Sequence, residues 1–153
     1  MRAGDLAPDF TLLDQDGASV SLKALLVNGP VVLFFYPAAM TTGCTRETCH
    51  FRDLAGEFKA LGAQRVGISL DGVERQHEFA TQNHLDYPLL ADDRAQVATS
   101  FGVKRSFDLL KVRRTTFVID TDQRVLATIH NEINMNAHAN KALAALRARG
   151  SAH

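Results

Sequence analysis

The chain has 153 residues, 46% hydrophobic and 22% charged, which suits one globular domain with a buried core. Lysine plus arginine and aspartate plus glutamate number 17 each, so the charge balance gives no support to binding of nucleic acid or of an anionic membrane. The N-terminus lacks the long apolar segment of a secretory signal and no run is long enough to span a membrane, so we expect a cytoplasmic protein.

Two short strands are predicted near the start of the chain. Residues 9–13 and 18–22 flank the turn-like sequence DQDG, and this pattern predicts a hairpin beside the main sheet. A short helical turn is expected over residues 22–26, before the sequence Asn-Gly-Pro breaks the chain.

A strand followed by a helix carries both cysteines. Residues 31–36, VVLFFY, form an apolar run typical of a strand that is covered on both faces. Pro37 ends this run, and apolar residues then recur at the spacing of a helix predicted over residues 44–61. We therefore expect Cys44 in the first turn of this helix or just before it.

The middle of the chain predicts a parallel crossover. Residues 65–70, RVGISL, form a second apolar run and lead into a helical pattern over residues 73–83. A short strand over residues 89–91 and a short helix over residues 94–101 follow. Strand, helix and strand in this order favour parallel pairing.

The last third of the chain predicts a hairpin and a closing helix. Residues 103–113 have no clear period and predict a loop over the active-site side. Residues 115–120 and 124–129 flank a polar turn, and residues 137–149 form the helix. The whole pattern predicts an α/β fold with a mixed central sheet flanked by helices, without a second domain.

Cys44 is placed where a thiol can act as a nucleophile. A thiol attacks only as its thiolate, and the unpaired N–H groups and dipole of a helix N-terminus stabilise negative charge. Thr41 lies three residues earlier, where its hydroxyl can accept from and donate to whatever meets the sulfur. Taken alone, Thr41 is explained as well by a helix cap.

Cys49 follows Cys44 by five residues. On an ideal helix this separation corresponds to about 140° of rotation and about 7.5 Å of rise, which places the Cα atoms roughly 8 to 9 Å apart. An unstrained disulfide needs less than about 7 Å, so the cysteines cannot pair until the first helical turn unwinds. This spacing argues against a simple C-x-x-C dithiol exchanger. The alternative for Cys49 is a small buried hydrophobic residue.

These residues resemble a known family. Pro37, Thr41 and Cys44 match the P-x-x-x-T-x-x-C signature of peroxiredoxins, and the spacing to Cys49 is that of the atypical 2-Cys bacterioferritin comigratory protein, or PrxQ, subfamily. The similarity covers nearly the whole chain, with one departure at Thr42, where many members carry proline. It implies a thioredoxin-like peroxiredoxin fold with an N-terminal hairpin, as one domain over residues 1–153. The other matching stretches are GDLAPDFTLLDQDG, FFYP, CTRETCHFRDL and RRTTFVIDTD.

The resemblance also implies the roles of site residues. Neighbouring strand residues face opposite sides, so only one of Arg113 and Arg114 can reach the thiolate, and the family pattern assigns this role to Arg114. Arg114, Thr41 and the loop N–H groups would bind the peroxide oxygens, while Pro37 would shield the sulfur.

Attack on a hydroperoxide would leave Cys44 as a sulfenic acid, which Cys49 would resolve as an intramolecular disulfide. Thioredoxin or a similar dithiol would then reduce this disulfide. The implied reaction needs no metal, flavin or haem cofactor. Because both cysteines lie in one chain, a monomer is expected.

Other interpretations remain open from the residues alone. A general thiol–disulfide oxidoreductase would use the same cysteines, and a structural or metal-binding module would include His50 beside Cys49, although the spacing matches no common zinc motif. Glu47 is either a partner of the arginine or a first-turn acid that complements the helix dipole.

Overall fold

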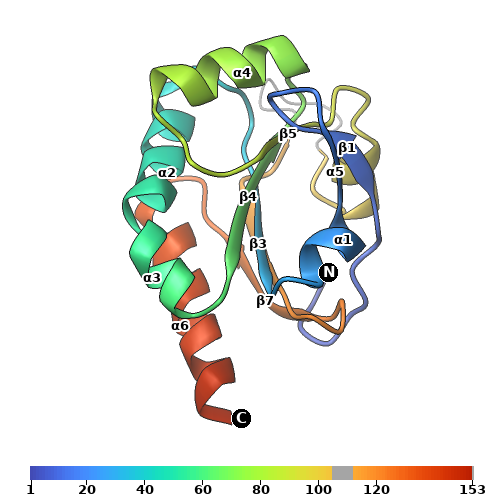
Figure 1. Cartoon of the computed structure of the whole chain (residues 1–153), viewed down its shortest axis with the longest axis vertical. Coiled ribbons are helices and arrows are strands. Elements are labelled where there is room, and N and C mark those ends of the chain that lie inside the picture. The colour runs from blue at the N-terminus through green and yellow to red at the C-terminus, as the bar shows by residue number, and fades with distance from the viewer. Residues whose placement is uncertain (105–111, 153) are drawn as a thin grey trace.

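One mixed sheet runs through the computed structural model, which describes residues 1–104 and 112–152 (Figure 1). The strand order is β2-β1-β5-β4-β3-β6-β7. β3 pairs in parallel with β4, which pairs in parallel with β5, and the remaining pairs are antiparallel. The strands are β1 (Thr11–Leu13), β2 (Ser19–Ser21), β3 (Val31–Phe35), β4 (Gln64–Ser69), β5 (Leu89–Ala91), β6 (Thr115–Ile119) and β7 (Val125–His130).

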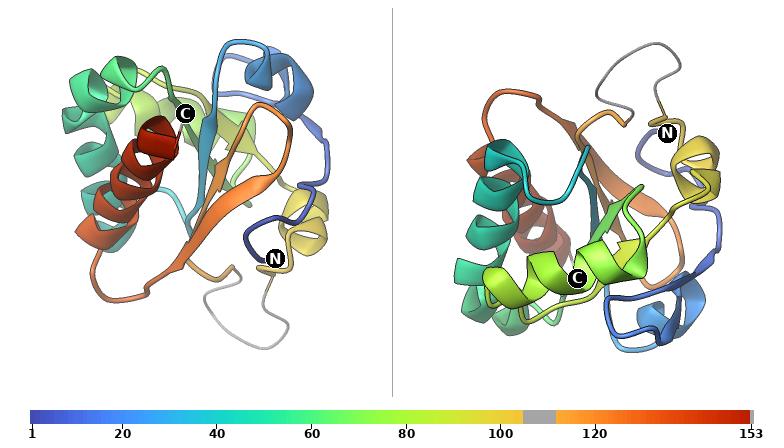
Figure 2. Two further views of the ribbon diagram at one scale, coloured as in Figure 1. Left: turned by 90° about the horizontal axis from the view of Figure 1, so that it is seen from below. Right: turned by 90° about the horizontal axis from the view of Figure 1, so that it is seen from above.

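Helices cover both faces of the sheet (Figure 2). α1 and α5 lie on one face, and α2, α3, α4 and α6 lie on the other. The helices are α1 (Leu22–Leu26), α2 (Thr42–Asp53), α3 (Ala55–Ala60), α4 (Val73–Gln82), α5 (Gln96–Ser100) and α6 (Asn136–Ala152). Among the described residues, no helix combines the length and the apolar character needed to cross a bilayer.

β3 connects the two cores, because all five of its side chains are buried. Successive strand residues point to opposite faces, so alternate β3 residues enter different hydrophobic clusters. The ring of Phe34 stacks on the ring of Phe51 in α2, with centroids 4.1 Å apart. This stacking helps to fix α2 against the end of β3, from which the chain enters the loop that leads to Cys44.

The order of elements agrees with the prediction, including the opening hairpin, the parallel crossover and the closing hairpin. The prediction of a single helix over residues 44–61 is wrong in its bounds. The observed helical segment begins at Thr42 and is interrupted at Leu54, whose backbone angles of φ −96° and ψ 19° separate α2 from α3. Phe51 and Phe58 bury into the same cluster on either side of the break, which explains why the apolar spacing gives no sign of it.

Two smaller expectations have different outcomes. The helix predicted over residues 94–101 begins only at Gln96, because Ala95 adopts a left-handed conformation with φ 56°. The loop predicted over residues 103–113 falls largely on residues 105–111, which lie outside the described residues. At its ends, Lys104 and Val112 form an isolated antiparallel bridge.

Candidate active site

Cys44 is the third residue of α2, and its side chain is 0% exposed. The first N–H groups of a helix lack intrahelical acceptors, so the sulfur lies at an end that favours negative charge. In the loop before α2, Met40 adopts a left-handed backbone with φ 70°, a conformation that costs a non-glycine residue roughly 1 to 3 kcal/mol. The prediction that Cys44 lies in the first turn is confirmed.

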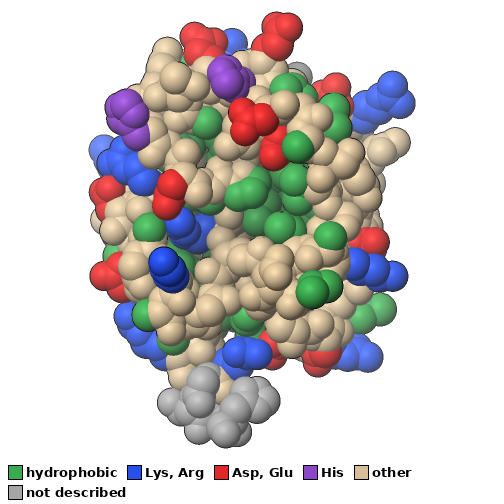
Figure 3. Space-filling view, viewed as in Figure 1, with side chains coloured by type: hydrophobic (Ala, Val, Ile, Leu, Met, Phe, Trp, Pro, Cys, Tyr) green, Lys and Arg blue, Asp and Glu red, His purple; other side chains and the backbone are tan. Residues whose placement is uncertain are grey.

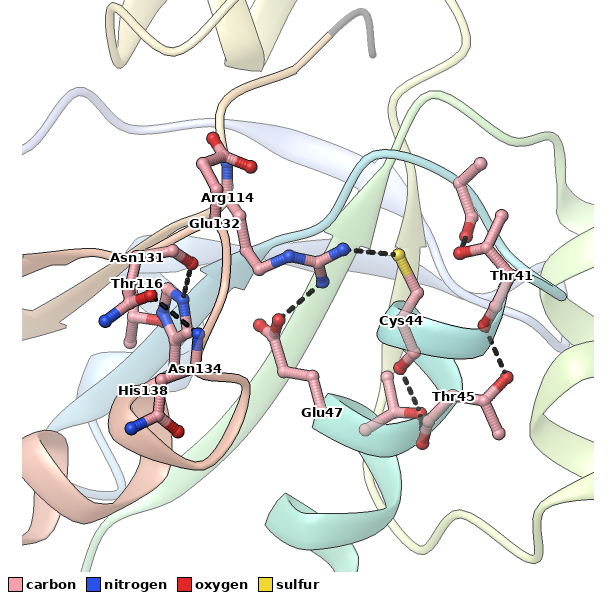
Figure 4. Close-up of polar contacts among 12 residues, drawn as sticks. Thr41, Cys44, Thr45, Glu47, Arg114, Thr116, Asn131, Glu132, Asn134 and His138 are labelled. Carbon is pink, nitrogen blue, oxygen red and sulfur yellow. Dashed lines mark hydrogen bonds and ion pairs between the residues drawn. The ribbon is translucent and has the colours of Figure 1, made fainter.

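Arg114 reaches the sulfur from the segment just before β6 (Figure 4). Its Nη2 group donates to Cys44 Sγ over 3.3 Å, and the residue is only 6% exposed. Arg113 is exposed. Of the two arginines, the structure thus places Arg114 against Cys44, across 70 residues of sequence.

Glu47 holds the other arm of the same guanidinium. Arg114 Nη1 donates to Glu47 Oε2 over 2.6 Å, and both side chains are buried. Burial raises the pKa of Glu47 from 4.5 to about 7, against the lowering effect of Arg114. Burial also lowers the pKa of Arg114, but the charges of Glu47 and Cys44 outweigh this and raise it overall. Of the two interpretations of Glu47, the structure supports the arginine partner, because Glu47 lies beyond the first turn.

Thr41 occupies the N-cap position of α2, yet its hydroxyl makes no capping hydrogen bond. The hydroxyl instead donates to the carbonyl of Ala38 over 2.9 Å, and the residue is exposed. A hydroxyl that donates once keeps its acceptor lone pairs. Pro37 is buried and follows the last residue of β3 by two positions.

Cys49 is half-buried further along α2, and neither cysteine forms a disulfide. Its thiol donates to Oδ1 of Asn83 over 3.6 Å. Asn83 Nδ2 donates to the Phe79 carbonyl over 3.0 Å, which turns Oδ1 toward the sulfur. Arg52 donates to the backbone carbonyl of Asn83 over 2.6 Å. Sequence patterns gave no sign of Asn83, because it lies 34 residues from Cys49.

Residues 3–128 of the chain match the AhpC/TSA family. The chain belongs to this family. A Mycobacterium tuberculosis protein named as a peroxiredoxin is 59% identical over 150 residues, which cover 97% of each chain. A chloroplastic peroxiredoxin Q of Oryza sativa subsp. japonica is 38% identical over 144 residues, which cover 94% of this chain and 66% of the rice protein. The chain is thus a peroxiredoxin.

Solved peroxiredoxin structures share the fold. Peroxidoxin BcpB from Mycobacterium tuberculosis is 59% identical, covers 97% of each chain and superposes with a TM-score of 0.93. The bacterioferritin comigratory protein of Xanthomonas campestris, described with an alkyl peroxide reduction activity, is 27% identical with a TM-score of 0.87 and covers 97% of this chain and 99% of its own. The thioredoxin-like peroxiredoxin fold and the resemblance to the PrxQ subfamily are both confirmed.

In this peroxiredoxin the rear half of α2 is tied to its surroundings through backbone carbonyls. The hydroxyl of Tyr87 donates to the carbonyl of Thr48 over 2.7 Å. Nη1 of Arg65 donates to the carbonyl of Phe51 over 2.9 Å. These two contacts hold carbonyl groups of the rear half, whereas in the front half Arg114 holds the side chains of Cys44 and Glu47.

A buried histidine braces the segment beside Arg114, and sequence reasoning missed it. His138 in α6 contacts the hydroxyl of Thr116 through Nδ1 and the carbonyl of Asn131 through Nε2, each over 2.7 Å (Figure 4). Burial lowers the pKa of His138, which favours its neutral form. Glu132 in the same loop accepts from the backbone N–H of Arg114 over 3.1 Å.

The metal-binding interpretation finds no support in the part of the chain that the structure describes, where no group of three His, Cys, Asp or Glu side chains could hold an ion. His50 contacts Asn140 in α6 over 3.0 Å instead of joining the cysteines.

A cavity of about 520 Å³ lies away from the peroxiredoxin site, between α3 and the start of β4. Its walls include Lys59, Arg65 and Tyr87, but neither cysteine. Hydrophobic side chains also gather in the middle of one face of the molecule (Figure 3).

Proposed function

We propose that the chain is a thiol-dependent peroxidase in which Cys44 is the peroxidatic cysteine. The observation that carries this proposal is the contact of 3.3 Å between Arg114 Nη2 and Cys44 Sγ, at a helix N-terminus and out of contact with bulk water. A buried cation and the helix dipole both stabilise a thiolate there. Glu47 holds the guanidinium in place through its second arm.

The substrate is a hydroperoxide, either hydrogen peroxide or an organic hydroperoxide, as the activity named for the Xanthomonas campestris relative supports. Arg114 and the hydroxyl of Thr41 flank the first turn of α2 from opposite sides (Figure 4). Together with the loop N–H groups they bind the two peroxide oxygens and stabilise the leaving oxyanion. Pro37, buried beside this loop, limits access of water to the sulfur.

The reaction proceeds in two chemical steps. The Cys44 thiolate attacks one peroxide oxygen, the O–O bond breaks, and the leaving hydroxide or alkoxide takes up a proton, which leaves Cys44 as a sulfenic acid. The thiol of Cys49 then displaces water from this sulfur and forms the Cys44–Cys49 disulfide. Both cysteines lie on one helix, so the first turn of α2 must unwind before the sulfurs meet.

An external dithiol, most simply thioredoxin, returns the disulfide to two thiols through a mixed disulfide. The two electrons that reduce the peroxide therefore come from this dithiol, and no metal, flavin or haem takes part. We further propose that the chain works as a monomer of one domain in the cytoplasm, because one subunit contains both cysteines.

Intact mass and free-thiol counts test this proposal. Reduced wild type, Cys44→Ser and Cys49→Ser are each measured before and after one equivalent of hydrogen peroxide. Within seconds, wild type is expected to lose two hydrogens, Cys49→Ser to gain one oxygen, and Cys44→Ser to stay unchanged. If all three remain unoxidised, the peroxidase proposal is wrong. An insulin-reduction assay then tests the general oxidoreductase alternative.

A further inference from the structure

A set of buried and partly buried polar contacts ends on the loop that precedes α2, and the proposed mechanism does not use it. Asp71 follows β4, and its Oδ2 atom accepts two short hydrogen bonds. One comes from the backbone N–H of Ala39 over 2.7 Å, and the other from the hydroxyl of Ser69 over 2.6 Å. A carboxylate oxygen with two short donors is a strong anchor, because bonds to ionised acceptors exceed neutral ones in strength.

The anchor is itself held from the core. Gln76 in α4 donates from Nε2 to Ser69 Oγ over 3.0 Å and to the carbonyl of Leu90 over 2.8 Å. Tyr36, the residue after β3, donates from its hydroxyl to Gln76 Oε1 over 2.5 Å. Tyr36 and Gln76 are 0% exposed. Fully paired buried networks of this kind impose one arrangement on the groups they join.

The outer side of Asp71 faces a weaker partner. Arg75 in α4 places Nε 3.5 Å from Oδ1, and the arginine side chain is 58% exposed. The strong contacts of the carboxylate thus all lie on the inner oxygen, which faces the loop and the core.

The anchored peptide lies close in sequence to a residue that touches the substrate in the proposed reaction. Ala39 is followed by Met40, whose left-handed backbone needs support from its surroundings, and then by Thr41. The hydroxyl of Thr41 donates back to the carbonyl of Ala38. Asp71 therefore holds one end of the short segment that orients the Thr41 hydroxyl, and α2 holds the other end.

We infer that Asp71 is a positioning residue for peroxide reduction: its carboxylate fixes the loop at Ala39, and thereby the Thr41 hydroxyl, while Ser69 and Gln76 fix the carboxylate. This inference rests on the proposed function. Asp71 acts on the geometry of the bound peroxide and not on the sulfur, because its contacts reach the loop and not Cys44 or Arg114. Misplacing a reacting group by about 1 Å can lower a rate up to roughly 10²-fold.

The test separates the reaction with peroxide from the reactivity of the sulfur. The rate constant for oxidation of the reduced protein by hydrogen peroxide is measured by competition with a haem peroxidase, since the chain has no tryptophan to report the reaction. Alkylation by iodoacetamide is measured in parallel, because it needs the thiolate but no bound peroxide. Thermal unfolding is followed for every variant.

Asp71→Ala is expected to slow oxidation by peroxide about tenfold or more while alkylation stays within about twofold of wild type. Asp71→Asn is expected to restore most of the rate, because an amide oxygen can still accept from both donors. The matched control is Asp92→Ala. Asp92 is a buried carboxylate that, like Asp71, accepts backbone N–H bonds, here from Val97 and Ala98, so its loss is expected to lower the melting temperature without slowing oxidation.

Two results would overturn the inference. One is a peroxide rate in Asp71→Ala within twofold of wild type, and the other is an equal loss of the peroxide and alkylation rates, which would show an effect on the sulfur. If Asp71→Ala does not fold, Ser69→Ala is tested in its place. Its rate constant for oxidation by peroxide is expected to fall about threefold, and an unchanged rate constant would refute the inference. Slow oxidation of wild type itself would refute the proposed function, and the inference with it.

Discussion

The two halves of α2 present their cysteines to opposite kinds of partner. At the front, Cys44 receives a hydrogen bond from the Arg114 cation and is fully buried. Further along, Cys49 is half-buried and gives its hydrogen bond to a neutral amide oxygen of Asn83. A cationic donor stabilises a thiolate, whereas an acceptor without a charge stabilises the S–H form. One helix thus presents one sulfur to a cation and the other to a neutral acceptor.

The two halves are also held differently. In the front half, Arg114 contacts the side chains of Cys44 and Glu47, whereas in the rear half Tyr87 and Arg65 bond the Thr48 and Phe51 carbonyls. Opening of the front turn has to break the contacts of Arg114 with Cys44 and Glu47, while the carbonyl contacts of the rear half can persist. Different groups therefore hold the two ends of one helix, so the front turn can open without releasing Cys49.

The largest expected effect comes from removing the cation of the front half. Arg114→Gln is expected to lower the rate constant for oxidation by hydrogen peroxide by about 10²- to 10³-fold, because the sulfur and the leaving oxygen both lose their charged donor. Competition with a haem peroxidase gives the rate. Arg113→Gln is the matched control, since Arg113 is exposed. An equal fall of this rate constant in both variants would show that the contact with Cys44 does not distinguish Arg114 from Arg113.

A second test examines Glu47, whose carboxyl group accepts a hydrogen bond from Arg114. Burial raises the pKa of Glu47 to about 7, so between about pH 4.5 and 7 the folded chain keeps a proton that the unfolded chain has released. Stability from this group is therefore complete below about pH 4.5 and is lost as the pH rises through about 7.

Glu47→Gln removes this titration. The free energy of unfolding of wild type relative to the variant is expected to fall, by up to about 3 kcal/mol, between pH 4 and pH 8. Urea denaturation at the two pH values measures the change. A difference between the proteins that does not vary with pH would show that Glu47 has no raised pKa.

A third test moves the guanidinium without removing it. A Cβ atom at Gly43 would lie 3.3 Å from Arg114 Nη2 and 3.5 Å from Met135 Sδ. Gly43→Ala is therefore expected to shift the cation away from Cys44 and to slow oxidation by peroxide about tenfold. Gly56→Ala in α3 is the control, since nothing lies within 4 Å of its Cβ. An unchanged rate in Gly43→Ala would show that the contact tolerates displacement.

The smallest expected effect belongs to the rear half. Asn83→Ala removes the acceptor of the Cys49 thiol, so disulfide formation after oxidation is expected to be about two- to fivefold faster, with the first oxidation unchanged. Quenched-flow mass spectrometry follows the sulfenic acid and the disulfide separately. Asn140→Ala removes a comparable bond to His50 of the same helix and is expected to change neither step by as much. Equal effects of the two substitutions would mean that Asn83 only anchors the helix.

The order of the elements was predictable from the sequence, and the placement of Arg114 beside Cys44 from the family resemblance. The continuous apolar run of β3 marks a strand buried on both faces, and the family signature marks Pro37, Thr41 and Cys44 within a few residues. The break at Leu54 was not predictable, because Phe51 and Phe58 face the same cluster and keep the apolar spacing of one helix. The left-handed Ala95, which delays α5, likewise has no signature, because alanine is a common helix residue.

The partners around the cysteines were harder to predict for another reason. Asn83 contacts Cys49 across 34 residues, and Asp71 contacts Ala39 across 32. Each is a polar residue near the end of an element, where such residues are common as caps and turns. Only the pairing of β3 with β4, and the packing of α4 beside them, brings these residues to the site.

The hydrogen bonds to the Thr48 and Phe51 carbonyls determine how much of the chain between Cys44 and Cys49 can unwind. If opening of α2 stops at Thr48, residues 42–47 are released while Cys49 stays in place. Five residue steps from Cys44 to Cys49 span up to roughly 17 Å when extended, about twice the separation that the helix imposes. Cys44 can thus swing to Cys49 without moving it. If the proposed disulfide forms in this way, a reducing protein would meet it beside Asn83 and the end of α4, and not at the buried position that Cys44 occupies in the intact helix.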